Sequence, residues 1–404
     1  MGMTTGPSSA RGLRVKRSFI FLGLLSAVVT RGTEPTVEER LKALENQVQQ
    51  LAHENADLKK QLGFKDAASP VRPQPAGKET KLIIGGFLQA QAEFGGAADP
   101  RFVGVHDRFY FRRARVYLAG SFTENFDFKA ELDLQGNTLG AATGQLTRAN
   151  EIYINWRKFS YANVRFGQLK AAFGAEQLAG DSRGLAIERS FTSDRLTDGR
   201  QLGVSVGGDL PGGLVNYTVM IANGSGANSS ANDNSKFART ARVVFTALNE
   251  KDNHLTIGVD GLWTKDASVT KAGFGFAGNI FSGERHGWGI DADWKHHDFE
   301  LTGEWLRGTF EPTGAVPAAK FDSEGWQVTA GYFLLPHQLQ VVLRREMFDP
   351  NTSLGGDSTR SWTFGLNYLI KGDDLRLMTD YIVGRGPGAS GDEGRLLTRF
   401  QLIF

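Results

Sequence analysis

Between Lys81 and Phe404 the chain alternates polar and apolar residues, and this period of two is the feature that most limits its fold. The alternation comes in runs of about ten residues, separated from one another by Gly, Asn, Asp or Pro. In residues 126–135 every second side chain is apolar, namely Phe126, Phe128, Ala130, Leu132 and Leu134. Successive side chains of a β-strand point to opposite faces, so each run is expected to be a strand with one apolar and one polar face.

The number of runs and the lengths of their links favour a membrane barrel. Sixteen runs begin near Leu82, Arg108, Phe126, Arg148, Tyr161, Gly199, Gly213, Lys236, Asp252, His286, Asp298, Asp322, His337, Ser358, Asp374 and Gly394. Short links, such as the one at Pro336, alternate with long ones, such as residues 265–285. An even strand number with short turns on one side and long loops on the other is typical of bacterial outer-membrane barrels. The sequence therefore predicts an all-β fold, a 16-stranded antiparallel transmembrane β-barrel over residues 81–404. A soluble β-sandwich remains open on periodicity alone.

Aromatic residues support the membrane interpretation. Three pairs lie six residues apart on one face of a predicted strand: Trp288 with Trp294, Trp326 with Tyr332, and Trp362 with Tyr368. Such pairs suit the aromatic girdles at the two membrane interfaces. The chain also ends in an alternating strand with an aromatic residue, Phe404, which resembles the terminal assembly signal of outer-membrane barrels.

Three segments precede the predicted barrel. In residues 1–30, Lys16 and Arg17 are followed by a short apolar run, which predicts a secretory signal peptide. Residues 34–62 carry apolar side chains at alternating steps of four and three, with Asn55 at a core position. This heptad pattern predicts a coiled-coil helix that joins subunits in the periplasm. Residues 63–80, with Pro70, Pro73 and Pro75, predict a semi-extended linker.

Composition excludes several function classes. The chain has no Cys, so it has neither a disulfide framework nor a thiolate metal site. Removing the four basic residues of the signal segment lowers the formal net charge from +2 to about −2, which makes nucleic acid an improbable partner. No motif suggests a catalytic nucleophile, so an enzyme is not expected. We also expect no cofactor and no bound metal; the His296 and His297 pair lies in a solvated turn.

The stretch from Lys170 to Arg200 has no clean period and separates two short alternating segments. An insert of this length inside a compact domain is usually functional. We expect it to fold into the barrel as a constriction loop over residues 170–200. The charged residues predicted at the constriction are Lys170, Glu176, Asp181, Arg183, Arg189, Asp194, Arg195 and Arg200. Those predicted on the pore wall are Arg113, Arg115, Lys129, Glu131, Asp133, Arg157 and Arg165.

Several stretches resemble a known family. Residues 111–134, 151–178 and 187–203, with the passages GQLKAAFGAE and IERS, are similar to the phosphate-selective porin O and P family. The resemblance implies a sixteen-stranded trimeric channel, in some members with an N-terminal coiled coil. Phosphate-selective members share a Lys cluster at the constriction and a ladder of Arg along the wall. Lys170 matches a basic position of that passage, whereas Gln168 stands where a basic residue is common.

The expected function is passive diffusion of small hydrophilic solutes or ions through a water-filled homotrimeric channel. Charges of both signs occur in the loop and on the wall, so general diffusion and selectivity for inorganic anions such as phosphate both remain open. Arg113 and Arg115 could form an anion rung or pair with Glu131 and Asp133 on the neighbouring strand. A structural tether that acts through the coiled coil is the alternative function.

Overall fold

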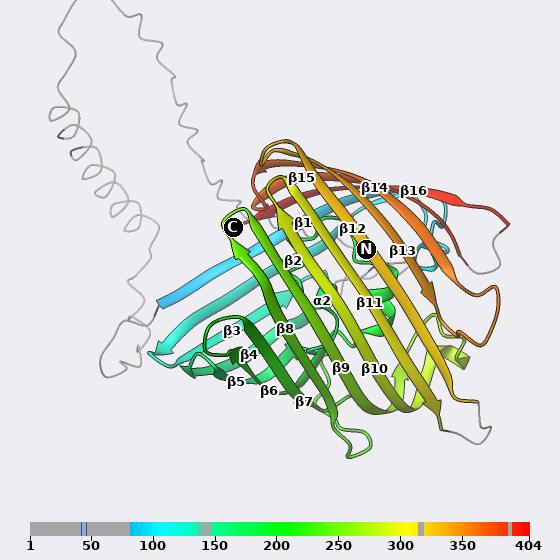
Figure 1. Cartoon of the computed structure of the whole chain (residues 1–404), viewed down its shortest axis with the longest axis horizontal. Coiled ribbons are helices and arrows are strands. Elements are labelled where there is room, and N and C mark those ends of the chain that lie inside the picture. Colours follow the sequence, from blue (N-terminus) through cyan, green and yellow to red (C-terminus); the bar gives the residue numbers. More distant parts are fainter. Residues whose placement is uncertain are drawn as a thin grey trace, which may run out of the picture. The chain divides into compact units, whose positions relative to one another are not determined.

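The computed structural model describes residues 81–135, 139, 147–313, 319–386 and 390–404, together with Lys42 and Asn46. The predicted signal peptide (1–30) and linker (63–80) lie outside these residues. So does the predicted coiled coil (34–62), apart from Lys42 and Asn46, which are helical. In the described part, sixteen antiparallel strands form one closed barrel (Figure 1).

The strands are β1 (Lys81–Gly95), β2 (Arg108–Thr123), β3 (Phe126–Asp133), β4 (Arg148–Phe159), β5 (Ala162–Lys170), β6 (Arg200–Asp209), β7 (Val215–Ala222), β8 (Ala238–Glu250), β9 (Asn253–Thr270), β10 (Ile280–His296), β11 (Phe299–Pro312), β12 (Phe321–Leu335), β13 (Leu339–Asp349), β14 (Thr359–Lys371), β15 (Leu375–Arg385) and β16 (Glu393–Ile403). Each pairs with its neighbours in the sequence, and β1 pairs with β16. The predicted 16-stranded antiparallel barrel is therefore confirmed, and short turns alternate with long loops as expected.

One predicted strand start is wrong. β10 begins at Ile280 rather than near His286, because β9 and β10 remain paired as far as Thr270 and Ile280. At this end of the hairpin the outward side chains include Ser282, Glu284 and His286, and Lys265 forms an ion pair with Glu284 at 3.2 Å. The alternation of apolar and polar residues therefore fades before the backbone pairing ends. The connection is correspondingly short, residues 271–279, and contains the 3-10 helix η2 (Ala277–Asn279).

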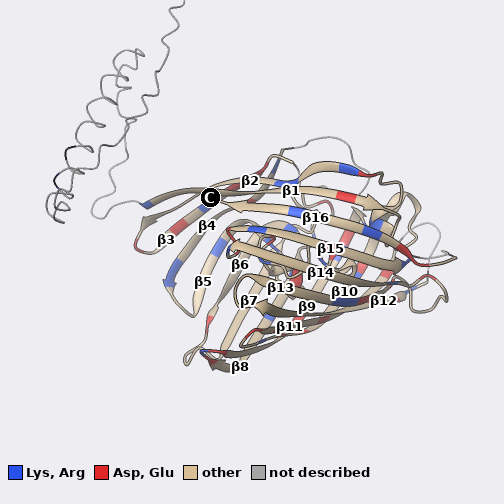
Figure 2. Ribbon diagram, turned by 90° about the horizontal axis from the view of Figure 1, so that it is seen from above, with Lys and Arg blue, Asp and Glu red and all other residues tan. Residues whose placement is uncertain are grey.

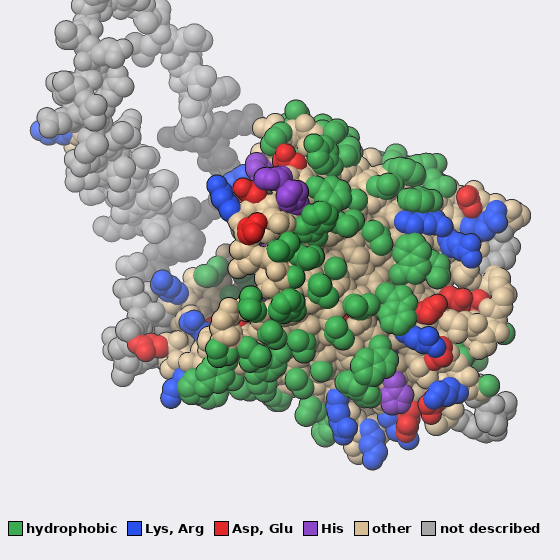
Figure 3. Space-filling view, in the orientation of Figure 1, with side chains coloured by type: hydrophobic (Ala, Val, Ile, Leu, Met, Phe, Trp, Pro, Cys, Tyr) green, Lys and Arg blue, Asp and Glu red, His purple; other side chains and the backbone are tan. Residues whose placement is uncertain are grey.

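The outward faces of the strands are apolar. Large hydrophobic side chains such as Phe109, Ile154, Phe166 and Phe364 are exposed there. Figure 3 shows hydrophobic side chains over the middle of the strands and charged ones toward their two ends. Figure 2 shows Lys, Arg, Asp and Glu spread along the strands, and many of them, such as Arg113, Asp260, Glu304 and Arg399, are buried inside the barrel. An apolar belt around a polar interior matches lipid outside and water inside.

The last residue takes part in closing the barrel. The Phe404 amide donates a hydrogen bond to the Gly86 carbonyl at 3.0 Å, and the Gly86 amide donates to the Phe404 carbonyl at 2.9 Å. The Phe404 side chain is exposed on the outer surface. Backbone pairing thus extends to the C-terminal residue, which leaves no free strand edge at this end.

A bulge in β2 changes which of its side chains face the interior. Gln89 of β1 pairs with Arg113 and the next residue, Ala90, pairs with Phe111, so Arg112 is an extra residue. As a result, both Arg112 and Arg113 are buried inside the barrel. Strict alternation would place Arg112 on the lipid face, where a charge is costly.

The barrel also contains an apolar core. Side chains of the constriction loop pack there against the inner wall of β9 to β13 and against the β9–β10 connection. The buried cluster consists of Phe173, Phe191, Leu196, Leu262, Phe274, Phe281, Leu306, Phe310 and Phe348. This cluster fills part of the interior and fixes the loop to one side of the barrel.

Candidate functional site

The segment between β5 and β6 contains two short helices that the sequence analysis did not predict. They are α2 (Ala175–Leu178) and α3 (Phe191–Leu196). The Ser190 side chain caps α3 by accepting a hydrogen bond from the Ser193 amide at 3.1 Å. None of the helices in the described residues is long and apolar enough to cross a membrane.

Carboxylates on distant strands hold the backbone of this loop. Asp380 on β15 accepts a hydrogen bond from the Ile187 amide at 2.7 Å, and Glu346 on β13 accepts one from the Phe191 amide at 2.6 Å. Glu304 on β11 accepts hydrogen bonds from the amides at the start of α2. A loop inside a barrel must satisfy its backbone donors away from bulk water, and these carboxylates do so.

Asp181 sits at the centre of a cluster of predicted site residues. Its carboxylate forms ion pairs with Arg115 at 2.5 Å, Arg113 at 3.4 Å and Arg200 at 3.9 Å, and it also pairs with Arg189. Burial alone would raise the pKa of Asp181, but the charges of Arg113, Arg189 and Arg115 outweigh it and hold the pKa well below its ordinary value. Asp181 therefore carries a negative charge surrounded by an excess of cations.

A second cluster, around Glu188, was missed by the sequence analysis. Arg112 binds Glu188 at 2.8 Å, and Arg399 on β16 pairs with the same carboxylate. Burial opposes ionisation here too, but Arg112, Arg399 and Arg113 lower the pKa of Glu188 below its ordinary range. Only the bulge in β2 makes Arg112 available, so alternation in the sequence could not reveal this site.

Several predicted constriction residues make contacts that hold the loop in place. Glu176 pairs with Arg344 on β13 at 2.7 Å, and Asp194 pairs with Arg101 at 2.7 Å. The Arg195 guanidinium lies over the ring of Phe191, 4.7 Å from its centroid.

Asp198, also in the loop, contributes a further anchor. It binds Lys271 at 2.7 Å and Arg285 at 2.8 Å. Burial works against ionisation, yet Arg285 and Lys271 lower the pKa of Asp198 to about 2.

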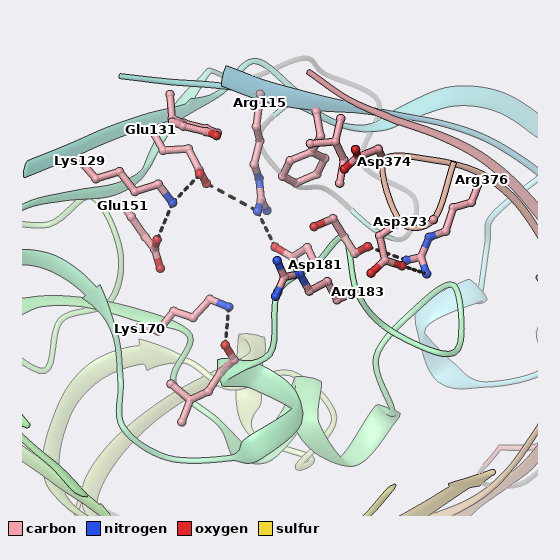
Figure 4. Close-up of a pocket in the computed structure, with 18 of the residues that line it drawn as sticks. Arg115, Lys129, Glu131, Glu151, Lys170, Asp181, Arg183, Asp373, Asp374 and Arg376 are labelled. Carbon is pink, nitrogen blue, oxygen red and sulfur yellow. Dashed lines mark hydrogen bonds and ion pairs between the residues drawn. The ribbon is translucent and has the colours of Figure 1, made fainter. Parts of the chain in front are cut away.

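A cavity of about 1250 Å³ lies between the loop and the surrounding barrel wall, with residues of β1 to β7 and β10 to β16 in its lining. Figure 4 shows Lys129, Lys170 and Arg183 directed into this cavity. The predicted site residues in its lining are Arg115, Lys129, Glu131, Arg165, Lys170, Asp181, Arg183 and Arg200. Three predicted wall residues lie outside the lining: Arg113, Asp133 and Arg157. We call this space the pore cavity.

The charges of the pore cavity do not balance. Its lining has nine Lys and Arg residues and six Asp and Glu residues. Each of the six carboxylates forms an ion pair, namely Glu131, Glu151, Asp181, Glu300, Asp373 and Asp374. Of the cations in this lining, Arg165, Lys170 and Arg183 form no ion pair with any residue that the structure describes. The Lys170 ammonium instead donates hydrogen bonds to the carbonyls of Leu178 at 3.0 Å and Ala179 at 2.7 Å.

A smaller cavity of about 330 Å³ lies on the other side of the loop. Its lining includes Arg148, Arg189, Asp194 and Asp198. Arg200 lines both this cavity and the pore cavity. Arg200 thus lies where the two cavities approach each other across the loop.

In the part of the chain that the structure describes, no group of three or more His, Asp or Glu residues lies close enough together to hold a metal ion.

Sequence comparison identifies one family and one relative. Residues 87–404 match the family described as phosphate-selective porin O and P. Porin O of Pseudomonas aeruginosa is 24% identical over 184 residues, which cover 45% of this chain and 41% of the relative. The aligned part thus spans about two fifths of the relative's length.

Solved structures show a similar fold. The anion-selective porin from Comamonas acidovorans aligns with a TM-score of 0.59 and 12% identity, over 81% of this chain and all of that one. The outer-membrane channel DcaP of Acinetobacter baumannii aligns with a TM-score of 0.56 and 15% identity, over 82% and 99% of the two chains. At these identities the likeness concerns the fold alone.

Proposed function

The chain belongs to the phosphate-selective porin O and P family, and from this premise we propose that it admits small hydrophilic anions by passive diffusion. As an outer-membrane porin it is a channel rather than an enzyme. The solutes would cross through the pore cavity and past the constriction loop. Inorganic anions such as phosphate fit this proposal.

One observation carries the proposed anion preference: every carboxylate of the pore cavity is ion-paired, whereas Arg165, Lys170 and Arg183 form no ion pair with the residues that the structure describes. A paired carboxylate contributes little net field at a distance, while an uncompensated cation attracts anions into a narrow aqueous space. Selectivity for anions needs basic groups gathered at the narrowest part of a pore. The excess of cations beside the loop meets that requirement.

We place the constriction at Arg200, because this residue lines the cavities on both sides of the loop. In the β5–β6 register, Lys170 lies opposite Arg200 at the base of the loop. Two cations therefore flank the point where the loop leaves the wall. An anion that crosses from one cavity to the other would meet both side chains.

We further propose that the channel is a homotrimer with residues 34–62 as a periplasmic coiled coil. The heptad pattern supports this assembly, and a trimer form is named for OmpT of Vibrio cholerae, an outer membrane protein of similar fold (TM-score 0.56, 11% identity). A tether that acts through the coiled coil remains the alternative. Deletion of residues 34–62 separates the channel from the tether.

The test is the zero-current potential of the purified full-length channel in a planar bilayer under a KCl gradient. We expect the sign that corresponds to preferential chloride passage. Added phosphate should reduce the chloride current, because phosphate would occupy the same cationic passage. A potential of the opposite sign, or one near zero together with no effect of phosphate, would show that anion selectivity is wrong.

A further inference from the structure

A third cavity, of about 300 Å³, lies among the long loops and shares no lining residue with the pore cavity. Its lining includes Ala97, Asp99, Pro100, Phe191, Asp357 and Glu393. We call it the loop cavity. Its volume falls within the range of small-molecule sites, which begins at about 300 Å³.

Much of the loop cavity is apolar. The rings of Phe191 and Phe348 meet edge to face, with their centroids 5.1 Å apart. Pro100, Val103 and Pro350 add aliphatic surface. Aromatic rings beside aliphatic side chains suit the apolar body of an organic molecule.

The charged groups in the lining are all acidic. Asp99, Asp357 and Glu393 take part in it, and no Lys or Arg does. The negative charge of Asp99 is compensated by Arg101, which forms an ion pair with it at 2.8 Å and also binds Asp194. Two carboxylates of the loop cavity therefore remain available.

These two carboxylates have no cationic partner within the described ranges. Glu393 accepts a hydrogen bond from the Ala97 amide, which leaves its charge uncompensated. The Oδ1 atom of Asp357 is shielded from solvent and has no hydrogen-bond partner. A shielded carboxylate oxygen without a partner is unfavourable, and a bound cation would remove that cost.

We propose that the loop cavity binds an organic cation with an apolar body. The ammonium group would lie beside Asp357 and Glu393, and the apolar body would pack against Phe191 and Phe348. A bare metal ion fits less well, because it requires about six oxygen ligands and the remaining wall is largely apolar. The inference is independent of the anion preference proposed for the pore cavity.

Phe191 gives the site a direct connection to the channel, because it is the first residue of α3 in the constriction loop. Its amide is held by Glu346 and its ring is buried in the apolar cluster. A ligand in the loop cavity would therefore contact the element that narrows the pore.

The test is isothermal titration of benzyltrimethylammonium into the full-length channel in detergent, with a neutral analogue, tert-butylbenzene, for comparison. We expect saturable binding of the cation only. The double variant Asp357→Asn/Glu393→Gln should weaken binding by roughly tenfold or more, because it removes both charges and keeps the acceptor for Ala97. Asp392→Asn is the matched control, since Asp392 adjoins Glu393, pairs with Arg385 and lies outside the lining.

The folded state of each variant is checked by the mobility shift of the heated and unheated protein in gel electrophoresis. Absence of saturable binding to the native channel would overturn the proposal. Equal affinity of the native channel and the correctly folded double variant would do so too. An equal loss of affinity in Asp392→Asn would show that general surface charge, not the loop cavity, attracts the cation.

Discussion

At the scale of single residues, the decisive property is whether a charge has a partner. Arg183 and Arg157 have the same side chain and lie in different surroundings. Arg183 lines the pore cavity without an ion pair in the described part of the chain, whereas Arg157 binds Asp127 at 2.9 Å near a short turn. Both are predicted at the pore from the sequence, and only their surroundings in the fold separate them.

Neutralising Arg183 should reduce anion selectivity. In Arg183→Gln we expect the ratio of chloride to potassium permeability to fall by roughly two- to fivefold, which corresponds to one charge acting through a largely aqueous space. The zero-current potential under a KCl gradient measures this ratio. Arg157→Gln is the matched control and should leave the ratio unchanged. Equal ratios in Arg183→Gln and the native channel would contradict the role of Arg183.

Acid should loosen the constriction loop. Asp181 and Glu188 have lowered pKa values in the folded state, so their contribution to stability is complete above the ordinary carboxyl pKa of about 4 and is lost as the pH falls below it. We therefore expect steady single-channel currents at about pH 7 and about pH 5, and larger fluctuations at about pH 3.

A variant identifies the source of this acid effect. Glu188→Gln leaves Arg112 and Arg399 without their carboxylate, so current fluctuations should already be large near neutral pH. They should then change less on acidification than in the native channel. If Glu188→Gln behaved like the native channel at every pH, protonation of Glu188 would not be the cause.

At the scale of elements, the constriction loop is held by charges on one side and by apolar packing on the other. α3 carries much of the apolar contact, since Phe191 and Leu196 both enter the cluster inside the barrel. The neighbouring Ser190 fixes the start of this helix through its hydrogen bond to the Ser193 amide. The position of the loop thus depends on a short helix whose stability comes from tertiary packing.

Removing one apolar contact of α3 should loosen the loop and leave the barrel closed. Leu196 is 4% exposed, and Leu196→Ala should cost about 2 to 5 kcal/mol of local stability. We expect faster protease cleavage within residues 171–199 and noisier channel currents. Leu178→Ala is the control, because Leu178 is half-buried and lines the pore cavity. Similar cleavage rates in both variants would show that the apolar cluster does not anchor the loop.

At the scale of the whole molecule, the barrel is complete without the preceding segments. β1 pairs with both β2 and β16, and Phe404 extends the pairing to the C-terminal residue. Every strand therefore has two neighbours, which satisfies the backbone in a membrane. The pore cavity and its charges also lie within this unit.

Deletion of residues 34–62 should leave conduction intact. We expect the same single-channel conductance and the same zero-current potential, together with a less heat-stable oligomer by cross-linking and gel electrophoresis. The coiled coil would then assist assembly, because its few heptads add to contacts made by the barrels. A correctly folded protein that does not conduct either with or without residues 34–62 would favour the tether, in which the barrel is only an anchor.

The sequence by itself determined the barrel. Lipid outside and water inside impose a local period of two on every strand, so the strand starts, apart from that of β10, could be read within two residues of their observed positions. The loop from Lys170 to Arg200 was equally visible, because it breaks that period. Among the residues that line the pore cavity, Arg115, Lys129, Glu131 and Arg165 could be proposed from their inward positions on the strands.

Only the tertiary structure decided how the charges are paired. In the sequence Arg115 is an inward position of a strand and Asp181 belongs to the loop; the folding of the loop into the barrel brings them together, and it also joins Ile187 to Asp380 across 193 positions. The bulge at Arg112 and the Phe cluster likewise depend on contacts between strands. Alternation is a local response to solvent, whereas a charge finds its partner through the fold, and selectivity depends on the charges that remain without one.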